Sequence, residues 1–505
     1  MMIQLINFRY YAEVIMARVL AGLEPERVFY FFEEICSVPH GSGNEKALSD
    51  MLVQFAKDRD LKVFQDKANN VYISKPATKG LENKKTVMLQ AHMDMVAVCT
   101  PDSNIDMTKE PVKIYVDGNS VRAKDTSLGA DDGTGVAMIL ALLDSKDTPH
   151  PALQAIFTTS EEVGLVGASQ LDPNLFESEY LINLDGGDNK EYLSVSCAGS
   201  STIIYTIDKE NQPLDKTGKK AYKLVIGGLV TGHSAMTAST YGANSIILLA
   251  ECFSEIAGVC AFDIAKVDGG TKMKAQPKDS WAVIVVDEKD AAAFENEVKT
   301  LETNYKADYL EFCPDLFIKA EPVDLPDTVM SSAAADKLTA LIDTVPNWAF
   351  KYFAPDKKAT KVSSNAGILT DDGEKIELTC MLRSNSDFLH LQYVRKMTRF
   401  SDMMGIPHRI ENQSMAWEYD PNAVLPKLYS DLIEKETGKR PVPVMMHGGV
   451  EPGTIIALAN SVGKKLSAIC MGASGSGAHS TEETLKIDSV GPAYDWMVKV
   501  INSLD

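Results

Sequence analysis

Three short apolar runs, each ending in acidic residues or a histidine, constrain the fold of this chain most. Residues 85–93 (KTVMLQAHM), 151–160 (PALQAIFTTS) and 179–185 (EYLINLD) have the length and composition of buried strands. An apolar helix pattern, GTGVAMILALLDS, lies between the first two at residues 133–145. Strands and helices that alternate in this way favour an α/β fold with parallel strands covered by helices. In such folds ligands bind beyond the carboxyl ends of the strands, where these polar residues stand.

The alternating pattern extends toward the N-terminus and changes in the middle of the chain. Helices are predicted at residues 26–38 and 45–60, with a strand at 70–76. After about residue 200 the sequence mixes strands and helices differently, as in the strand at 280–289 and the helix at 291–310. We expect this middle stretch to form a separate α+β domain inserted into the first.

The length of the chain supports the same division. With 505 residues, the chain exceeds the size of about 250 to 300 residues at which single cores stop growing, so we expect two or three domains. The alternating pattern resumes after Trp417. We therefore predict one domain from residues 1–200 and 418–505, with residues 201–417 inserted. The insert is long enough to hold two similar α+β halves.

Composition and charge exclude several classes of protein. The formal net charge of −20 argues against nucleic-acid binding, because such proteins gather lysine and arginine on one face. The eight cysteines are spread singly, without the paired spacing of thiolate metal sites. Reduced cysteines are typical of a cytoplasmic protein. Arg9, Glu13 and Arg18 interrupt any signal-like apolar run, so we expect no secretory signal and no membrane span. Met16 is the expected natural start, with residues 1–15 a dispensable extension.

The first run ends in a histidine and an acid that share one side of the sheet. His92 and Asp94 are two residues apart, and side chains at that spacing in a strand point the same way. Asp94 could fix the second ring nitrogen of His92, as a metal-binding histidine requires. The alternative is a strand end that carries ordinary solvated polar residues.

Acidic pairs stand at the next positions. Asp131 and Asp132 precede a helix, where capping would explain one carboxylate but not two. Glu161 and Glu162 follow the second run, and Asp185 ends the third. Acids clustered at one sheet edge would raise one another's proton affinity unless a cation neutralised them. A cation site is therefore predicted.

One further histidine completes the candidate site. His479 lies in the glycine- and serine-rich stretch GASGSGAHSTEE, whose flexible backbone lets an imidazole reach a distant cluster. Mixed imidazole and carboxylate ligands favour zinc over calcium or magnesium, and five ligands with a bridging aspartate suit two ions. Each signal is weak alone, and their shared position at strand ends makes the set stronger.

The motifs HMDM, GADDG, EEVG, NLD and GAHS, in that order, resemble the dinuclear zinc peptidases that include carboxypeptidase G, acetylornithine deacetylase and the carnosinases. Within that group the segments CSVPHGSGNE, SLGADDGTGVA and CAGS look most like the bacterial aminoacyl-histidine dipeptidases, also called peptidase D. The resemblance runs from about Leu23 to the C-terminus. It implies a catalytic domain with a helix-covered mixed sheet, and it makes the inserted α+β domain a lid.

The resemblance also implies a role for each residue of the candidate site. His92, Asp131 and Asp185 would hold one zinc ion, and Asp131 would bridge to a second ion held also by Glu162 and His479. Manganese or cobalt could replace zinc. By the same similarity Glu161 is the general base, Asp94 orients His92, and the bond between Asp131 and Asp132 is cis.

The resemblance extends to candidate substrate contacts. On the lid these are His233 in TGHSA, Asn244 in YGANS and Arg383 in CMLRS. His447 and Glu451 in HGGVEPG resemble a substrate-lining loop of the catalytic domain, although the same letters suit a glycine-rich turn. Relatives usually carry a second lid histidine beyond the first. None occurs here, which leaves the oxyanion role unassigned.

The predicted function is metal-dependent hydrolysis of dipeptides, Xaa-His or a broader range, by a zinc-bridged water with Glu161 as general base. A lid that holds both substrate ends would favour dipeptides over longer chains. The alternatives are an N-acyl amino acid deacylase or other exopeptidase of the same family, and a non-catalytic peptide-binding relative. The expected partner is a small peptide, and a monomer and a homodimer are both compatible with the sequence.

Overall fold

The computed structural model of the chain describes residues 18–187, 191–235, 237, 243–354 and 359–504. The predictions about Met16 and residues 1–15 lie outside these ranges. The chain divides into two compact units. The first unit comprises Met1–Ser196, Tyr419–Met445 and Val450–Asp505, and the second unit comprises Cys197–Glu418 and Met446–Gly449. The short segment Met446–Gly449 thus groups with the insert, whereas the sequence assigned all of residues 418–505 to the other domain.

The first unit is built on an eight-stranded mixed sheet. In spatial order its strands are β1 (Lys62–Gln65), β2 (Val71–Lys75), β6 (Leu153–Thr158), β3 (Val87–His92), β7 (Tyr180–Asn183), β21 (Ser467–Cys470), β8 (Tyr192–Ser196) and β20 (Val442–Met445). Strand β3 runs parallel to both β6 and β7, and β21 runs parallel to β7. Strand β21 therefore lies between β7 and β8, two strands that are neighbours in sequence. The predicted α/β class with a mixed sheet is confirmed.

A second, four-stranded sheet in the first unit joins distant segments of the chain. Its order is β22 (Gly475–Ser476), β23 (Thr484–Lys486), β5 (Ser120–Ala123) and β4 (Ile114–Asp117). The helices of the first unit are α2 (Glu26–Cys36), α3 (Lys46–Lys57), α4 (Ala130–Asp144), α5 (Val166–Ser169), η1 (Pro173–Leu175), α10 (Val424–Thr437), α11 (Glu451–Ser461) and α12 (Ile487–Ser503).

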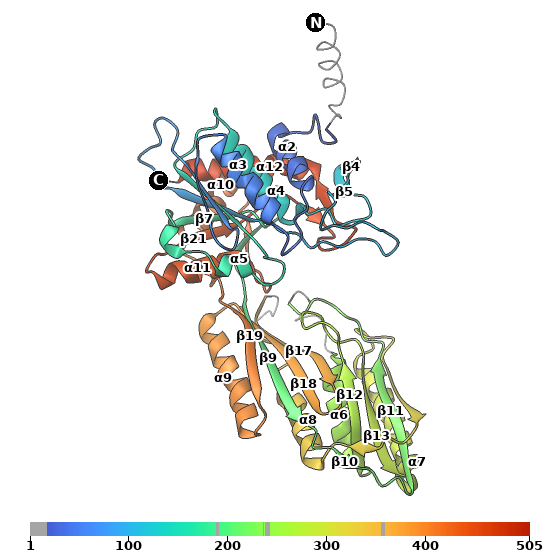
Figure 1. Cartoon of the computed structure of the whole chain (residues 1–505). Coiled ribbons are helices and arrows are strands. Elements are labelled where there is room, and N and C mark those ends of the chain that lie inside the picture. The colour runs from blue at the N-terminus through green and yellow to red at the C-terminus, as the bar shows by residue number, and fades with distance from the viewer. Residues whose placement is uncertain (1–17, 188–190, 236, 238–242, 355–358, 505) are drawn as a thin grey trace, which may run out of the picture. The chain divides into compact units, whose positions relative to one another are not determined.

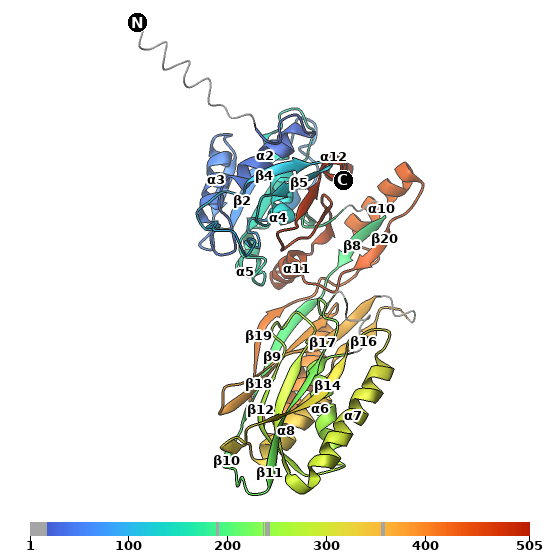
Figure 2. The same ribbon diagram turned by 90° about the vertical axis from the view of Figure 1, so that its right-hand side faces the viewer.

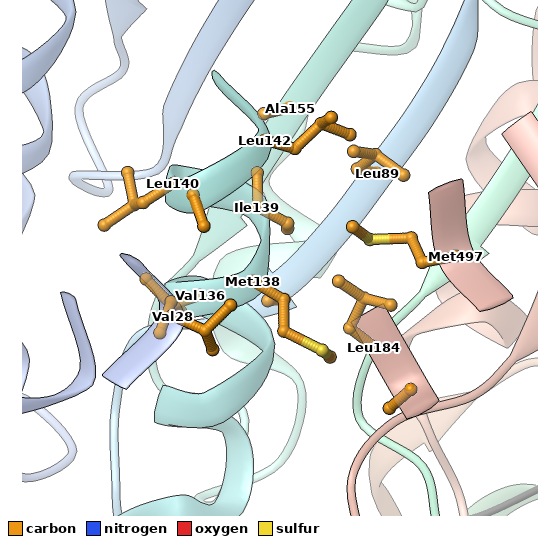
Figure 3. Packing of buried hydrophobic residues seen from close by; sticks show 14 of the residues in the cluster. Val28, Leu89, Val136, Met138, Ile139, Leu140, Leu142, Ala155, Leu184 and Met497 are labelled. Atoms are coloured by element: carbon orange, nitrogen blue, oxygen red, sulfur yellow. The ribbon is translucent and has the colours of Figure 1, made fainter. Parts of the chain in front are cut away.

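Helix α4 lies at the centre of the core of the first unit. Nearly all of its side chains are buried, because it is apolar on every face. Figure 3 shows Met138 and Ile139 of α4 packed among Val28 of α2, Leu89 of β3 and Met497 of α12. This packing fixes the direction of α4 and therefore the place of its first turn.

Helices cover both faces of the main sheet. Leu89 belongs to the core around α4, whereas the next residue along β3, Gln90, bonds to Glu451 of α11. Successive residues of a strand point to opposite faces, so α4 and α11 lie on opposite sides of β3. Figure 1 shows the ribbons of both helices beside this sheet.

The second unit is a sheet with its helices on one face, drawn from green to orange in Figures 1 and 2. Its strands are β14 (Phe317–Val323), β11 (Lys219–Gly227), β13 (Ser280–Asp287), β12 (Phe262–Gly269), β17 (Thr360–Asp371), β18 (Lys375–Ser384), β9 (Gly199–Asp208) and β19 (His408–Ser414) in spatial order, with β16 (Trp348–Tyr352) beside β17. Its helices are α6 (Ser245–Ala257), η2 (Glu288–Asp290), α7 (Ala291–Asp308), α8 (Ser332–Thr344) and α9 (Asp387–Met403), and β10 (Gln212–Pro213) pairs with β15 (Thr328–Val329). Side chains of α6, α7, α8 and α9 share one apolar core with the strands.

Two halves of the second unit have the same topology. One half follows the order β11, α6, β12, β13, α7, β14, and the other follows β9, α8, β17, β18, α9, β19. In each half the first strand lies between the fourth and the third, and the second strand lies beyond the third. The halves join where β12 meets β17, at Gly269 and Leu369. The first half is inserted in the chain between β9 and α8 of the other. In the described part of the chain, no helix has both the length and the apolar character needed to cross a bilayer.

Candidate metal centre

The strands β3, β6 and β7 bring their carboxyl ends to one edge of the sheet. His92 is paired in parallel register with Thr158, and Gln90 with Asn183. The residues that follow each strand must therefore emerge at the same edge. These are Asp94 after β3, Glu161 and Glu162 after β6, and Asp185 after β7, as the sequence predicted.

Two further segments approach this edge with unusual backbone geometry. Asp131 and Asp132 lie in the first turn of α4 with non-helical dihedral angles, after Gly129 with φ of 74°. The peptide bond between the two aspartates is cis, as the resemblance implied. His479 has a positive φ of 66° in the loop before β23. Both segments thus turn a polar side chain toward the strand ends.

The structure brings the five predicted metal ligands together in two overlapping sets. The donor atoms of His92, Asp131 and Asp185 lie within 4.8 Å of one another, and so do those of Asp131, Glu162 and His479. Asp131 belongs to both sets. A third set of the same compactness joins His92, Glu161 and Glu162.

The distances show how Asp131 faces both histidines. Its Oδ1 lies 3.2 Å from His92 Nε2, and its Oδ2 lies 3.4 Å from His479 Nε2. The same His479 nitrogen lies 2.8 Å from Glu162 Oε1. A carboxylate with one oxygen toward each of two imidazoles has the arrangement expected of a bridge between two ions.

The ring of His92 is held by its other nitrogen. His92 Nδ1 lies 2.9 Å from the backbone oxygen of Asp94 and 3.5 Å from its Oδ1. Nδ1 therefore donates to the backbone, and Nε2, which faces Asp131, is the nitrogen that a metal ion would take. The backbone of Asp94 orients the ring more closely than the carboxylate does, a division that the sequence did not reveal.

The carboxylate of Asp94 instead holds the loop after β6. It accepts hydrogen bonds from the backbone nitrogens of Glu161 and Glu162, at 2.9 and 3.2 Å, and from Ser42 Oγ at 2.7 Å. It is buried, with 1% of its surface exposed. Asp94 thus connects the segment that carries His92 with the two glutamates.

Acidic side chains outnumber the histidines in the cluster. Burial, together with the neighbouring carboxylates, raises the pKa of Glu161 to about 8. Burial and the charge of Asp131 raise the pKa of Asp185 well above its usual value. Hydrogen bonds to Asp131 and Glu162 raise the pKa of His479 to about 10. All three raised pKa values show that the cluster favours added positive charge.

The donor set fits a pair of zinc-like ions. Each three-residue set offers one imidazole and two carboxylates, and zinc sites in enzymes use such mixed ligands with a position left for water. A cavity of about 310 Å³ adjoins the cluster, lined by Asp131 and Asp185 and by the small residues 473–478. The cluster therefore has space beside it for a small molecule.

Glu451, predicted to contact substrate, is fully buried behind the strand ends. Its Oε2 accepts hydrogen bonds from Gln90 Nε2 and, at 2.7 Å, from Thr158 Oγ1. Gln90 in turn accepts from Asn183 Nδ2 at 2.8 Å. The network therefore joins β3, β6 and β7 at residues that come shortly before the residues of the cluster in each segment. Burial raises the pKa of Glu451 to about 7.

The other predicted substrate contacts lie in the second unit. Asn244 caps α6, accepting from the backbone nitrogens of Ile246 and Ile247, so the fold accounts for it. Arg383 on β18 is 5% exposed, and its Nε has no partner among the described residues. His447 Nε2 lies 2.7 Å from Ser363 Oγ. His233 is exposed and forms a bridge with Ala275. Contact between these residues and substrate stays a prediction.

Two acids that hold the ligand loops escaped the sequence analysis. Glu45 Oε1 accepts from the backbone nitrogen and Oγ of Ser160, at 2.9 and 2.8 Å, directly before the two glutamates. Glu483 accepts four backbone N–H groups, from Leu128 to Asp131. The sequence signal for Glu483 was its place four residues after His479.

The sequence profile of Peptidase family M28 matches residues 70–229 of this chain, about a third of its length. A curated relative, the cytosol non-specific dipeptidase of Escherichia coli K12, is 29% identical over 487 residues. The match covers 96% of this chain and 99% of the relative.

Solved structures extend the similarity to the fold. Aminoacylhistidine dipeptidase from Vibrio alginolyticus has a TM-score of 0.85 and 27% sequence identity, with 96% of this chain and 98% of that chain covered. Aminopeptidase PepT from Bacillus cereus has a TM-score of 0.54 and 17% identity, with 95% and 98% covered. The second similarity concerns the fold alone. The first confirms the predicted resemblance to aminoacyl-histidine dipeptidases over nearly the whole chain.

Proposed function

We propose that this chain, a metallopeptidase similar along nearly its whole length to two dipeptidases, hydrolyses dipeptides with a pair of divalent metal ions. One observation carries the proposal: two compact ligand sets share Asp131, and Glu161 lies beside them. The donor atoms of Glu161 lie within 4.8 Å of those of His92 and Glu162. A ligand set without a base would suit metal storage, whereas a base beside two ion positions suits hydrolysis.

The five residues divide between the two proposed ions. His92, Asp131 and Asp185 hold one, and Asp131, Glu162 and His479 hold the other. We propose zinc for both positions on the chemistry of these donors, with manganese or cobalt as possible replacements. Bound there, the ions lower the proton affinity of a water and polarise the peptide oxygen.

Glu161 moves the proton in the proposed reaction. It accepts a proton from the water whose oxygen attacks the peptide carbon. It then donates that proton to the amide nitrogen as the carbon–nitrogen bond breaks, which yields a carboxylic acid and an amine. Asp94 holds the backbone of Glu161 at 2.9 Å and so fixes the position of the base.

We further propose that Arg383 binds the substrate carboxylate. Its guanidinium is buried, and burial lowers its pKa to about 10. Buried guanidinium groups normally pair with an acid. Its Nη2 instead lies 3.1 Å from Met381 Sδ, and its Nε has no partner among the described residues, which leaves a site for an anion.

Exchange of Arg383 for Met tests this assignment. The variant should raise the KM for a dipeptide with a free carboxylate by about 10- to 100-fold, as loss of a charged hydrogen bond worth about 1.5 to 3 kcal/mol requires. The KM for the matching dipeptide amide should change little. Equal effects on the KM of the two substrates would show that Arg383 does not bind the substrate carboxylate.

The proposed substrates are dipeptides, Xaa-His among them, and the proposed location is the cytoplasm. The relatives carry the names cytosol non-specific dipeptidase and aminoacylhistidine dipeptidase. All eight cysteines of this chain lie in its described part, and none forms a disulfide. Reduced thiols suit a reducing compartment.

Metal analysis with a substrate panel tests the proposed function. The purified protein should bind two equivalents of zinc and hydrolyse dipeptides, including Xaa-His, faster than tripeptides. Acetylated amino acids test the deacylase alternative. Preferred cleavage of acetylated substrates would replace dipeptidase by deacylase, and binding of peptides without hydrolysis would make the chain a binding protein.

A further inference from the structure

Glu483 connects two segments that carry proposed metal ligands. It lies four residues after His479, in the loop before β23. Strand β23 pairs with β5, with Thr484 opposite Arg122, and the chain runs on from β5 to Asp131. Strand pairing thus places Glu483 beside the turn that leads into α4.

The carboxylate of Glu483 accepts four consecutive backbone N–H groups. Oε2 accepts from Leu128 and Gly129 at 2.8 and 3.0 Å, and Oε1 accepts from Ala130 and Asp131 at 2.9 and 3.2 Å. Glu483 is 4% exposed. All four bonds come from groups more than 350 positions away in sequence.

The helix itself offers these N–H groups no acceptor. The first N–H groups of any α-helix lack an intrahelical acceptor, and α4 begins after Gly129, which supplies no side-chain cap. A negative charge is also favourable at a helix N-terminus. An ordinary capping side chain satisfies one or two such groups from an adjacent position. Glu483 satisfies four from another segment, so it does more than end a helix.

We propose that Glu483 is a positioning residue that fixes Asp131 relative to His479 and thereby sets the affinity of the metal position formed by Asp131, Glu162 and His479. The inference rests on the proposed function only in taking that set as a metal position. Its bond to the N–H of Asp131 holds the bridging residue, and its short link to His479 holds the second ligand. The position formed by His92, Asp131 and Asp185 shares Asp131, but its other two ligands keep support from Asp94 and the strand ends.

Glu483→Gln is the main test, and the neighbouring Glu482→Gln is its matched control. A glutamine has one acceptor oxygen, so its NH2 group would face two of the four N–H donors. Glu482 is exposed, with 81% of its side chain accessible, and its carboxylate lies 3.6 Å from Arg122 Nη1. Both variants remove one charge from the same loop, but only Glu483→Gln removes hydrogen bonds to the backbone before Asp131.

Zinc titration by calorimetry should separate the two variants. Wild type and Glu482→Gln should bind two equivalents with the same affinities. Glu483→Gln should keep one equivalent near wild-type affinity and bind the second about 10- to 100-fold more weakly, the usual cost of losing a group that orients ligands. The visible spectrum of the cobalt-loaded variant should change as well. Two equivalents with wild-type affinities, and an unchanged cobalt spectrum, would overturn the proposal.

Hydrogen exchange in the wild-type protein gives a second test that needs no variant. After treatment with a chelator, the amides of residues 128–131 should still exchange slowly, because Glu483 holds them without metal. Exchange at the rate of an unprotected loop would overturn the proposal even if Glu483→Gln fails to fold. A wild-type protein that binds two ions but cleaves no dipeptide would instead refute the proposed function and leave this inference intact.

Discussion

The two units of the chain bury acidic groups in opposite ways. In the second unit, Asp371 is paired with Lys209 at 3.0 Å, and their side chains are 0% and 4% exposed. Lys209 also donates to the backbone oxygen of Ala265 at 2.8 Å, and Asp371 accepts from the backbone nitrogen of Val267 at 3.2 Å. Charge and hydrogen bonds are therefore balanced for this buried acid.

In the first unit the partly buried acids of the metal centre have no such balance. Asp131, Glu161, Glu162 and Asp185 gather with two histidines. Among the described residues, the ion pairs of these acids are with His92 and His479, and none is with a lysine or arginine. An acid that has its own counter-ion needs no further charge, whereas an unbalanced group of acids needs a cation from outside. The difference teaches which buried acids are structural and which are functional.

Metal removal should have the largest effect, and only through the first unit. Dialysis against a strong chelator should abolish dipeptide hydrolysis, and added zinc should restore it. The thermal unfolding midpoint should fall, since ions at a hundred times their dissociation constant contribute about 2.7 kcal/mol by mass action. Full hydrolysis by protein that metal analysis shows to be free of ions would contradict the claim that the acids of the first unit need a cation.

Glu161→Gln should remove the base while leaving the ion positions occupied. The kcat should fall by about 10²- to 10⁴-fold, the usual contribution of a general base. Zinc content should stay near wild type, because Glu161 lies outside the two sets that share Asp131. Atomic absorption and steady-state kinetics check both statements. A variant with most of its activity would assign the proton transfer to another group.

Lys209→Met should damage the second unit and spare the metal centre. Removing one partner of a buried pair leaves an uncompensated charge and costs about 3 to 5 kcal/mol. Urea unfolding followed by circular dichroism measures the loss, and zinc content should not change. Lys216→Met is the control, because its partner Asp327 is 95% exposed. Equal losses in the two variants would show that burial does not distinguish these pairs.

Arg409→Met should have the smallest effect. Arg409 Nη1 lies 2.5 Å from Glu377 Oε1, and hydrogen bonding to Arg409 lowers the pKa of Glu377. The pair therefore stabilises the fold at neutral pH, and the contribution is lost as the pH falls through that lowered pKa. Both side chains are partly exposed, so the loss should stay below about 1 kcal/mol. Urea unfolding at pH 7 should show it at low salt and not in 1 M sodium chloride.

Much of the first unit could be predicted from the sequence, because its signals are local. Apolar runs gave β3, β6 and β7, and the residues after each run gave the acids of the candidate centre. Parallel strands place their carboxyl ends at one edge of the sheet, so residues that follow the strands in sequence were expected to lie together in space. The helix α11 was not predicted, since HGGVEPG suggested a turn. In the second unit β16 and β19 were not predicted either, and β19 is mostly exposed and carries little apolar pattern.

The groups that hold the ligand loops could not be predicted in this way. Glu45 and Glu483 accept hydrogen bonds from backbone N–H groups. Every residue except proline has such a group, so no residue type in the partner segment indicates the contact. Glu451 had a motif, but its burial depends on the meeting of α11 with Gln90 and Thr158. Such contacts depend on tertiary packing, which local patterns do not encode.

The place of β21 has a consequence for synthesis on the ribosome. β7 and β8 emerge first, but residues 467–470 must be inserted between them before the sheet closes. At ordinary rates of translation the delay is roughly 15 to 55 s. During that interval the facing edges of β7 and β8 expose unpaired backbone groups, which can bond to other nascent chains. Newly made copies should therefore aggregate most readily before residues 467–470 have been translated, and slower elongation over the second unit should increase the aggregated fraction.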